Sequence, residues 1–303
     1  MKYTHIKADE FFRKINTEEK ARNWAWKSRF SGKDFICPDC GSEEYWQHKK
    51  DPEKRECIKC PKQMRLRAGT IFEASKIPML TWVRAIYFTM ASKRGISALE
   101  LKNQLEMKSY GTTWTVLHKI REALRQRDEA YKLQQIIELD GATFGKENSN
   151  NSREVLIAIE TKCWTDAKGR VKEKAGFAKI YVGRETKENA QTFVDGAVKE
   201  NSQINTDGSP ALRNLKNQDV DYQVTANDPE IIKRWLPWVH KFISNAKTWV
   251  LGTHHGVEAK YLESYLAEYT YRFNRRHDPD SLFHRALTAC ALAYPVKSQT
   301  LFG

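Results

Sequence analysis

The chain has 303 residues, which is enough for about two domains, and 40% of them are hydrophobic, so it can bury a sizeable core. Its 51 Lys and Arg exceed its 38 Asp and Glu by 13, an excess that indicates a polyanionic partner rather than a particular fold. No window approaches the roughly 18 consecutive apolar residues of a membrane helix, and the first residues lack the apolar core of a signal peptide. We therefore expect a cytoplasmic protein without a membrane partner.

The first segment, residues 1–33, mixes aromatic residues and alanines with charged residues. This pattern predicts one or two short amphipathic helices.

Two Cys-x-x-Cys pairs follow, Cys37 with Cys40 and Cys57 with Cys60, separated by 16 residues. In a reducing compartment, four Cys in two close pairs indicate a metal site rather than disulfides. Two such turns offer four thiolates to one tetrahedral zinc ion. We therefore predict a zinc ribbon with structural zinc over residues 34–70, in which metal binding supplies most of the folding energy.

Residues 71–130 have a helical pattern, with helices expected from Met79, over 98–105 and over 113–127. Two short helices followed by a longer basic one are typical of a helix-turn-helix unit, whose last helix enters the major groove of double-stranded DNA. An ordinary three-helix bundle is the alternative.

The same region concentrates positive charge, since residues 76–127 contain 10 Lys and Arg against 3 Asp and Glu. This favours nucleic acid contacts over a merely solvated helix surface. The candidate DNA-binding residues here are Lys119, Arg121 and Arg125.

A second domain is predicted over residues 134–303, after a short linker. Strand-like runs occupy residues 136–144, 154–159, 177–182 and 203–206, with a further possible strand at 221–225. Helices are expected over residues 186–199, from 229 onward, over 262–273 and over 283–293, and the polar residues 146–152 indicate a loop. Three strands, a helix, a strand and further helices predict a mixed α/β domain of ribonuclease H-like order.

Two isolated aspartates carry the chemistry of this domain. Asp140 and Asp207 each follow a strand-like run and precede a glycine, so both are expected at strand ends, where functional side chains commonly lie. Two neighbouring carboxylates repel each other unless a divalent cation lies between them, as in two-metal phosphoryl transfer with Mg²⁺. The alternative is that each Asp-Gly pair is a simple turn. Glu138 is expected on the same side of its strand as Asp140.

A phosphate-binding loop is not predicted. The string from Gly141 to Lys146 is one residue short of the Walker pattern, and Glu147 follows the Lys. We therefore expect no nucleoside triphosphate partner.

Taken together, these motifs give the chain a family resemblance. It resembles bacterial and archaeal insertion-sequence transposases of the DDE type with an N-terminal zinc ribbon, which are distantly related to the Merlin transposons of eukaryotes. The resemblance covers nearly the whole chain. It rests on Cys37–Gly41, Gly69–Phe72 with Pro78 and Trp82, Ile137–Asp140, Thr206–Gly208, Trp238–His240, Ser244 with Asn245, Gly252–Val257 and Tyr271–Arg276.

The resemblance implies a ribonuclease H-like catalytic domain that depends on Mg²⁺ or Mn²⁺. It also implies cleavage of double-stranded DNA at the inverted repeats of a mobile element, strand transfer into target DNA, association with the nucleoid and a homo-oligomer, expected to be a dimer on DNA. Asp140 and Asp207 match the first two acidic positions of the family. Where many relatives carry Glu in the third position, this chain has Asn245, whose amide oxygen is able to ligate Mg²⁺.

Several alternatives stay open at the level of sequence. His240, His254, His255 and Glu258 are other candidates for the third ligand, although imidazole suits Mg²⁺ poorly. Lys247, Arg272, Arg275 and Arg276 are candidate phosphate contacts or part of a solvated helix face. Cys163 and Cys290 are expected to be buried and inert. A catalytically inactive DNA-binding protein derived from a transposase, and a metal-dependent nuclease without strand transfer, are the alternatives to an active transposase.

Overall fold

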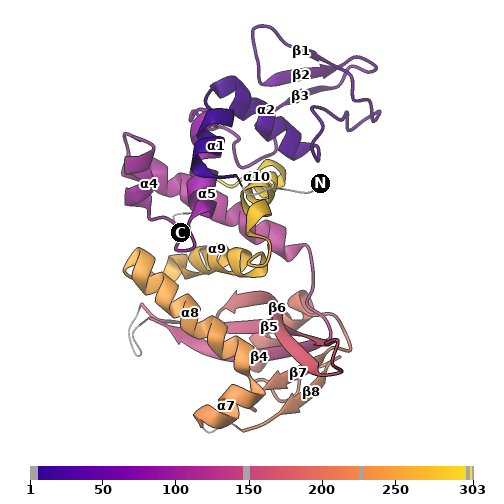
Figure 1. The fold of residues 1–303 in the computed structure, drawn as a ribbon, viewed down its shortest axis with the longest axis vertical. Helices are drawn as coiled ribbons and strands as arrows, with labels where there is room; N and C mark the ends of the chain where they lie inside the picture. Colours follow the sequence, from indigo (N-terminus) through magenta and orange to yellow (C-terminus); the bar gives the residue numbers. More distant parts are fainter. Residues whose placement is uncertain (1–5, 146–150, 225–227, 298–300, 302–303) are drawn as a thin grey trace. The chain divides into compact units, whose positions relative to one another are not determined.

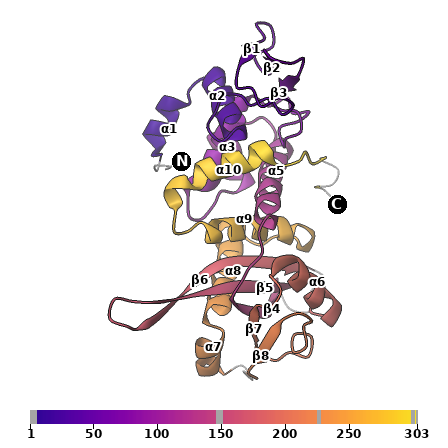
Figure 2. The same ribbon diagram turned by 90° about the vertical axis from the view of Figure 1, so that its right-hand side faces the viewer.

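The computed structural model of the chain describes residues 6–145, 151–224, 228–297 and 301 (Figures 1 and 2). The chain divides into two compact units. Unit 1 comprises residues 1–127 and 277–303, and unit 2 comprises residues 128–276. None of the described helices combines the length and the apolar composition that crossing a bilayer requires.

Unit 1 contains a small sheet and a set of helices. The sheet is antiparallel with the order β1-β2-β3 and consists of β1 (Tyr45–Gln47), β2 (Lys54–Cys57) and β3 (Gln63–Arg65). The helices are α1 (Ala8–Lys14), α2 (Glu18–Arg29), α3 (Met79–Ala91), α4 (Ala98–Gln104), α5 (Tyr110–Glu129), the 3-10 turn η2 (Pro279–Ser281) and α10 (Leu282–Leu292). Thr17 and Ser97 begin α2 and α4 by accepting hydrogen bonds from backbone N–H groups of the first turn, as N-caps do.

The helix α10 belongs to unit 1, although the sequence grouped residues 134–303 into one domain. Its Phe283 is buried, with its ring 5.3 Å from that of Phe11 and 5.7 Å from that of Tyr87. It therefore packs in the core formed by the N-terminal helices, whereas the other C-terminal helix, α9, lies in unit 2. Sequence order alone gave no sign of this return of the chain.

Unit 2 is a mixed five-stranded sheet flanked by helices. Its elements are β4 (Ile136–Phe144), β5 (Arg153–Thr165), β6 (Val171–Val182), α6 (Lys187–Ala197), β7 (Gln203–Thr206), β8 (Asp219–Tyr222), α7 (Pro229–Trp235), α8 (Pro237–His254), the 3-10 turn η1 (Ala259–Tyr261) and α9 (Leu262–Asn274). The strand order is β6-β5-β4-β7-β8, with β4, β5 and β6 antiparallel and β7 and β8 parallel to β4. This confirms the predicted mixed α/β fold class.

Two apolar cores lie on the two faces of this sheet. Because alternate residues of a strand point to opposite faces, Ile137 and Leu139 of β4 pack with α6, while Ala142 and Phe144 pack with α8 and α9. Asp140 is two residues before Ala142, so its side chain points to the same face, which is covered by α8.

The strands differ from their predicted extents in two places. β5 and β6 are longer than the predicted runs 154–159 and 177–182, because they continue together as a ribbon to Thr165 and from Val171. β8 covers residues 219–222 rather than 221–225, of which residue 225 lies outside the described residues. The predicted loop at 146–152 also lies mostly outside them.

The chain enters and leaves unit 2 at neighbouring points. Asp128 at the entry accepts a hydrogen bond of 2.6 Å from Arg275 Nη2 and one of 2.9 Å from Asn274 Nδ2, at the exit. Both side chains of the Asp128–Arg275 ion pair are largely buried. The entry is also fixed to the end of α6, because Leu133 is fully buried and exchanges backbone hydrogen bonds with residues 197 and 199.

Candidate functional site

Asp140 and Asp207 are brought together by the register of two parallel strands. β4 pairs with β7 so that Leu139 lies opposite Thr206, and the next residue of each strand is therefore one of the two aspartates. The end of β7 is held by Trp235, whose indole N–H donates a 2.7 Å hydrogen bond to the carbonyl oxygen of Thr206. Two carboxylates are thus juxtaposed at the edge where β7 ends.

The environment of Asp140 disfavours its charged form. The residue is 7% exposed, and burial raises its pKa to about 7, with further increases from the charges of Asp207, Glu185 and Glu138. A hydrogen bond from the Gly141 N–H opposes the shift. A divalent cation bound beside these carboxylates would compensate this repulsion.

Gly141 does not form a turn, which was the alternative for the Asp-Gly pair. The strand continues through this residue to Phe144, paired with β5. A Cβ atom at this position would lie only 1.9 Å from Glu185 Oε2. Gly141 therefore leaves room for the Glu185 carboxylate against the backbone of β4, at the residue after Asp140.

Glu185 was not predicted as a site residue. It lies in the loop between β6 and α6, and the hydroxyl group of Ser209 donates a hydrogen bond to its Oε1 atom. The N–H of the same Ser209 donates a 3.0 Å hydrogen bond to Asp207 Oδ1, so one residue links both carboxylates. Burial and the charges of Asp207 and Glu154 raise the pKa of Glu185, while the Ser209 hydrogen bond lowers it. The sequence signal was the small residue after Asp140, which has no side chain to exclude this carboxylate.

His240 on α8 makes the direct contact with Asp140 from the helical layer. Its Nε2 atom lies 3.3 Å from Asp140 Oδ2. Burial lowers the pKa of His240, against an opposing effect of the Asp207 charge, so the imidazole is mainly neutral at pH 7. A neutral imidazole offers either a lone pair or an N–H to its neighbour, depending on the tautomer.

Glu138 fixes the start of α8. Its Oε2 accepts hydrogen bonds of 2.7 and 2.8 Å from the backbone N–H groups of Trp238 and Val239, and Oε1 accepts one of 3.3 Å from Thr161. An anion at a helix N-terminus is favourable, yet burial dominates and raises the pKa of this carboxyl to about 7. Glu138 thus sets the position of the helix that carries His240.

Asn245 does not share the side of α8 that faces Asp140. Residues five apart on an α-helix point about 140° apart, and His240 occupies the facing position. The side chain of Asn245 is exposed, and within the described residues it makes no hydrogen bond to Asp140 or Asp207.

The remaining candidates for the third ligand also lie elsewhere. The ring of His254 is 4.7 Å from those of Trp249 and Tyr265. His255 ends α8 in the left-handed conformation, and the exposed Glu258 pairs with Lys260 at 3.6 Å.

The predicted DNA-binding cations of α5 are engaged within unit 1. Arg121 is 1% exposed, with Nη1 3.2 Å from His118 Nε2. Arg125 forms a bidentate pair with Glu122 at 2.8 Å. Lys119 Nζ lies 3.4 Å from the carbonyl oxygen of Ile71, and burial lowers its pKa.

The predicted DNA-binding cations of α9 are engaged within unit 2. Arg272 pairs with the buried Glu268 at 3.2 Å, and Arg275 pairs with Asp128. Arg276 donates hydrogen bonds to the carbonyl oxygens of residues 175, 176 and 273. By contrast, Lys247 on α8 is exposed, 5.8 Å from the ring centre of Phe144.

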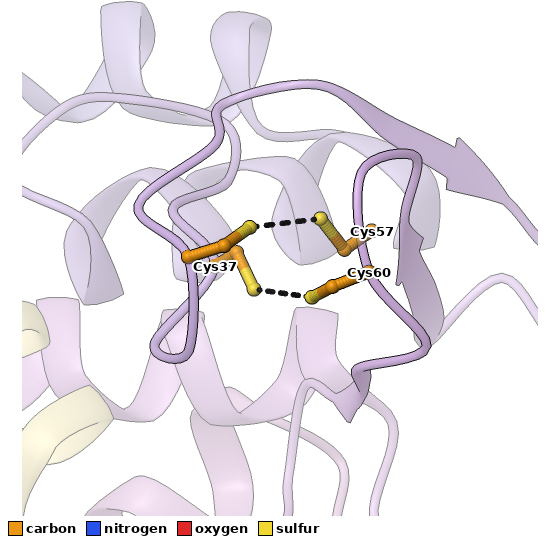
Figure 3. A group of neighbouring side chains, drawn as sticks. Cys37, Cys57 and Cys60 are labelled. Carbon is orange, nitrogen blue, oxygen red and sulfur yellow. Dashed lines mark hydrogen bonds between the residues drawn. The ribbon is translucent and has the colours of Figure 1, made fainter.

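The four paired cysteines form a separate cluster in unit 1, and three of them are labelled in Figure 3. All four sulfur atoms lie within 4.8 Å of one another. Cys37 and Cys60 are 3.4 Å apart, and Cys40 and Cys57 are 3.5 Å apart. These separations exceed the roughly 2.05 Å of a disulfide bond and approach the about 3.8 Å edge of a tetrahedron with 2.3 Å zinc–sulfur bonds. The cluster is compatible with structural zinc. Among the described residues, it is the one group of three or more His, Cys, Asp or Glu side chains whose ligand atoms lie this close together.

The two remaining cysteines differ from each other. Cys290 is buried, as expected, but Cys163 is exposed on the ribbon formed by β5 and β6, which corrects the expectation that it is buried.

Comparison with known proteins identifies unit 2. Residues 128–274 match the model of the ISXO2-like transposase domain, which coincides with the compact unit of residues 128–276. No curated protein sequence matches the chain.

Proposed function

Residues 128–274 of the chain belong to the ISXO2-like transposase domain family, and from this premise we propose that the protein is a metal-dependent DNA transposase. It binds the inverted repeats of an insertion sequence, hydrolyses a phosphodiester bond at each end and joins the released 3′-hydroxyl to target DNA. The substrate follows from the family, and the chemistry is our inference from the site.

The observation that carries this proposal is the register of β4 and β7, which places Asp140 and Asp207 at neighbouring positions, with Glu185 joined to Asp207 through Ser209. Their carboxylate oxygens are the ligands that Mg²⁺ and Mn²⁺ prefer, and their mutual repulsion needs a cation to offset it. We propose that Asp140 and Asp207 hold the catalytic ions. When bound, these ions would activate the attacking oxygen and stabilise the leaving one.

We propose that His240, rather than Asn245, completes the site. Its 3.3 Å contact with Asp140 supports a positioning role for the carboxylate, and its neutral ring is able to accept a proton from the attacking water or 3′-hydroxyl. An imidazole is a better ligand for Mn²⁺ than for Mg²⁺, so the two metals serve as separate probes.

The proposed reaction has two steps and needs no nucleotide cofactor. In the first, water attacks a phosphodiester, the P–O bond to the 3′ oxygen breaks, and a 3′-hydroxyl is released. In the second, that hydroxyl attacks a target phosphodiester and displaces another 3′ oxygen. Because one phosphodiester is exchanged for another, the second step needs no external energy source.

The test is cleavage of end-labelled duplex DNA that carries the element's inverted repeats, with Mg²⁺ or Mn²⁺. We expect the native protein to cut at the repeat ends and Asp140→Ala and Asp207→Ala to bind but not cut. His240→Ala should cut roughly 100-fold more slowly, at the lower end of the effect of a proton-transfer group. Asn245→Ala, on the same helix, is the control and should cut normally.

The alternative function is DNA binding without cleavage, by a protein derived from a transposase. An imidazole instead of a carboxylate beside Asp140 favours it, because one negative charge fewer weakens metal binding. Specific binding by the native protein without cutting under either metal would establish this alternative. A loss of cutting in Asn245→Ala but not in His240→Ala would restore the original assignment of Asn245.

The remaining parts of unit 1 complete the proposal. The four cysteines hold structural zinc, and α3, α4 and α5 form a helix-turn-helix-like unit that binds DNA. Two element ends have to be cut and joined together, so we propose that a dimer assembles on DNA.

A further inference from the structure

The ribbon made by the outer parts of β5 and β6 extends beyond the neighbouring strands of the sheet (Figure 2). Its paired residues run from Thr161 opposite Ala175 to Thr165 opposite Val171. All residues from Lys162 to Lys174 are exposed except Asp166 at the tip, which is partly buried. A two-stranded ribbon that is open on both faces gains little from hydrophobic burial.

Both ends of the ribbon are nevertheless held by specific hydrogen bonds. At its base, the buried Glu160 accepts 3.1 Å hydrogen bonds from the backbone N–H groups of Gln134 and Phe177. At the tip, Asp166 accepts hydrogen bonds from the N–H groups of Lys168 and Arg170 and pairs with the Arg170 side chain at 2.9 Å. The conformation of the ribbon is therefore fixed by side-chain hydrogen bonds at its base and at its tip.

The two faces of the ribbon differ in charge. Lys162 lies opposite Lys174, and Trp164 lies opposite Lys172, and side chains directly opposite each other project from the same face. We call this set of four residues the lysine face. The other face carries Cys163, Thr165, Val171 and Glu173.

The side chains of the lysine face remain available to a partner. Trp164 keeps 46% of its surface exposed, with Lys174 Nζ 5.4 Å from its ring centre. Lys162 lies 3.8 Å from Glu160 at the base, whereas Lys172 and Lys174 have no carboxylate within ion-pair distance in the described part of unit 2. Most of the cations expected to contact DNA are engaged inside their own unit, as described above.

We propose that the lysine face binds the phosphate backbone of duplex DNA. This inference rests on the proposed function and adds a contact surface to it. A two-stranded ribbon fits the roughly 12 Å wide major groove, and lysines on one face supply cations that contact phosphates without reading sequence. The exposed Trp164 ring adds an apolar surface against the deoxyribose.

The first test compares two double variants that each lose two positive charges. Lys172→Gln with Lys174→Gln changes the lysine face, and Lys199→Gln with Lys216→Gln changes two exposed lysines elsewhere in unit 2. The dissociation constant for repeat-end DNA and for unrelated duplex is measured over a range of salt concentrations. Each lost phosphate contact reduces the magnitude of the slope of log affinity against log salt by about 0.9. The slope should therefore be about 1.8 smaller in magnitude for the lysine-face variant and unchanged for the control.

The second test needs no variant. Acetylation of lysines in the native protein, read by mass spectrometry with and without DNA, should show protection of Lys172 and Lys174 but not of Lys199 and Lys216.

The outcomes separate this inference from the proposed function. If the native protein binds DNA while both variants keep the native slope and Lys172 and Lys174 stay reactive, the ribbon is not a DNA contact and the transposase proposal is unaffected. If the lysine-face variant keeps its affinity but changes its oligomeric state in size exclusion, the face is an interface between copies, and the inference is overturned. If the native protein binds no duplex at all, both proposals fail.

Discussion

Gly141 shows how an absent side chain shapes the site. A turn was the alternative for the Asp-Gly pair, whereas β4 continues through Gly141, whose missing side chain leaves room for the Glu185 carboxylate. That carboxylate comes from a loop distant in sequence, so local pattern had no means of finding it. The two aspartates, by contrast, are marked in the sequence by the apolar strand residues directly before them, although β4 continues through Asp140.

The role of Glu185 can be tested by its contribution to metal affinity. We expect Glu185→Gln to weaken Mn²⁺ binding roughly tenfold, the lower end of the effect of groups around a metal site, as measured by calorimetry without DNA. Gly141→Ala should have a similar effect, because the new Cβ displaces the Glu185 carboxylate.

Glu188→Gln is the matched control, since this exposed carboxylate lies three residues further along in α6. Equal Mn²⁺ affinity for Glu185→Gln and Glu188→Gln would assign Glu185 a purely structural role.

The raised pKa of Asp140 predicts a pH dependence of stability. Its pKa rises from 3.8 to about 7 on folding, so the folded state binds this proton more tightly than the unfolded state. The resulting stabilisation is fully present below about pH 4 and is lost as the pH rises through about 7. Each unit of difference between the folded and unfolded pKa corresponds to about 1.4 kcal/mol.

In urea unfolding with a chelator present, the free energy of unfolding should therefore fall between pH 4 and pH 7, and Asp140→Asn should flatten this slope. An unchanged slope in the variant would show that Asp140 is not the titrating group.

At the scale of elements, α8 decides which side chains reach the site. The sequence indicated a helix from Pro229 onward but not the break at Leu236 that separates α7 from α8. The break sets where α8 begins, and hence which residues face the sheet. Without the position of this break, residue order alone did not show whether His240 or Asn245 faces the sheet.

The start of α8 depends on Glu138, and this dependence can be measured. Glu138→Ala leaves the buried N–H group of Val239 and its neighbour Trp238 without their acceptor, and such a loss costs about 1–3 kcal/mol. We expect a lower urea midpoint and reduced cleavage through displacement of His240. Glu138→Gln retains one amide oxygen as an acceptor and should recover much of the loss, so equal destabilisation by both variants would contradict a capping role.

The strands were predicted where apolar residues mark them and missed where they do not. β4 and β7 carry buried aliphatic residues and were found with their observed bounds. The outer parts of β5 and β6 mix charged residues with Cys163, Trp164 and Val171 and lack a continuous apolar stripe. Their pairing is set by the anchored base and tip of the ribbon, which residue periodicity does not reveal.

At the scale of the whole molecule, the sequence indicated the parts but not their grouping. The four paired cysteines, the three helices and the mixed sheet follow one another along the chain in the expected order. The return of α10 to unit 1 depends on aromatic contacts such as that of Phe283 with Phe11, between residues at opposite ends of the sequence. Such long-range packing leaves no local pattern.

The ion pair of Asp128 with Arg275 has an architectural consequence. It joins the two ends of unit 2, and a domain whose ends meet is readily inserted into another fold. Unit 1 is interrupted in sequence by unit 2, which lies between α5 and α10 along the chain. Exchanging this module between relatives requires new junctions at only two adjacent points of the backbone.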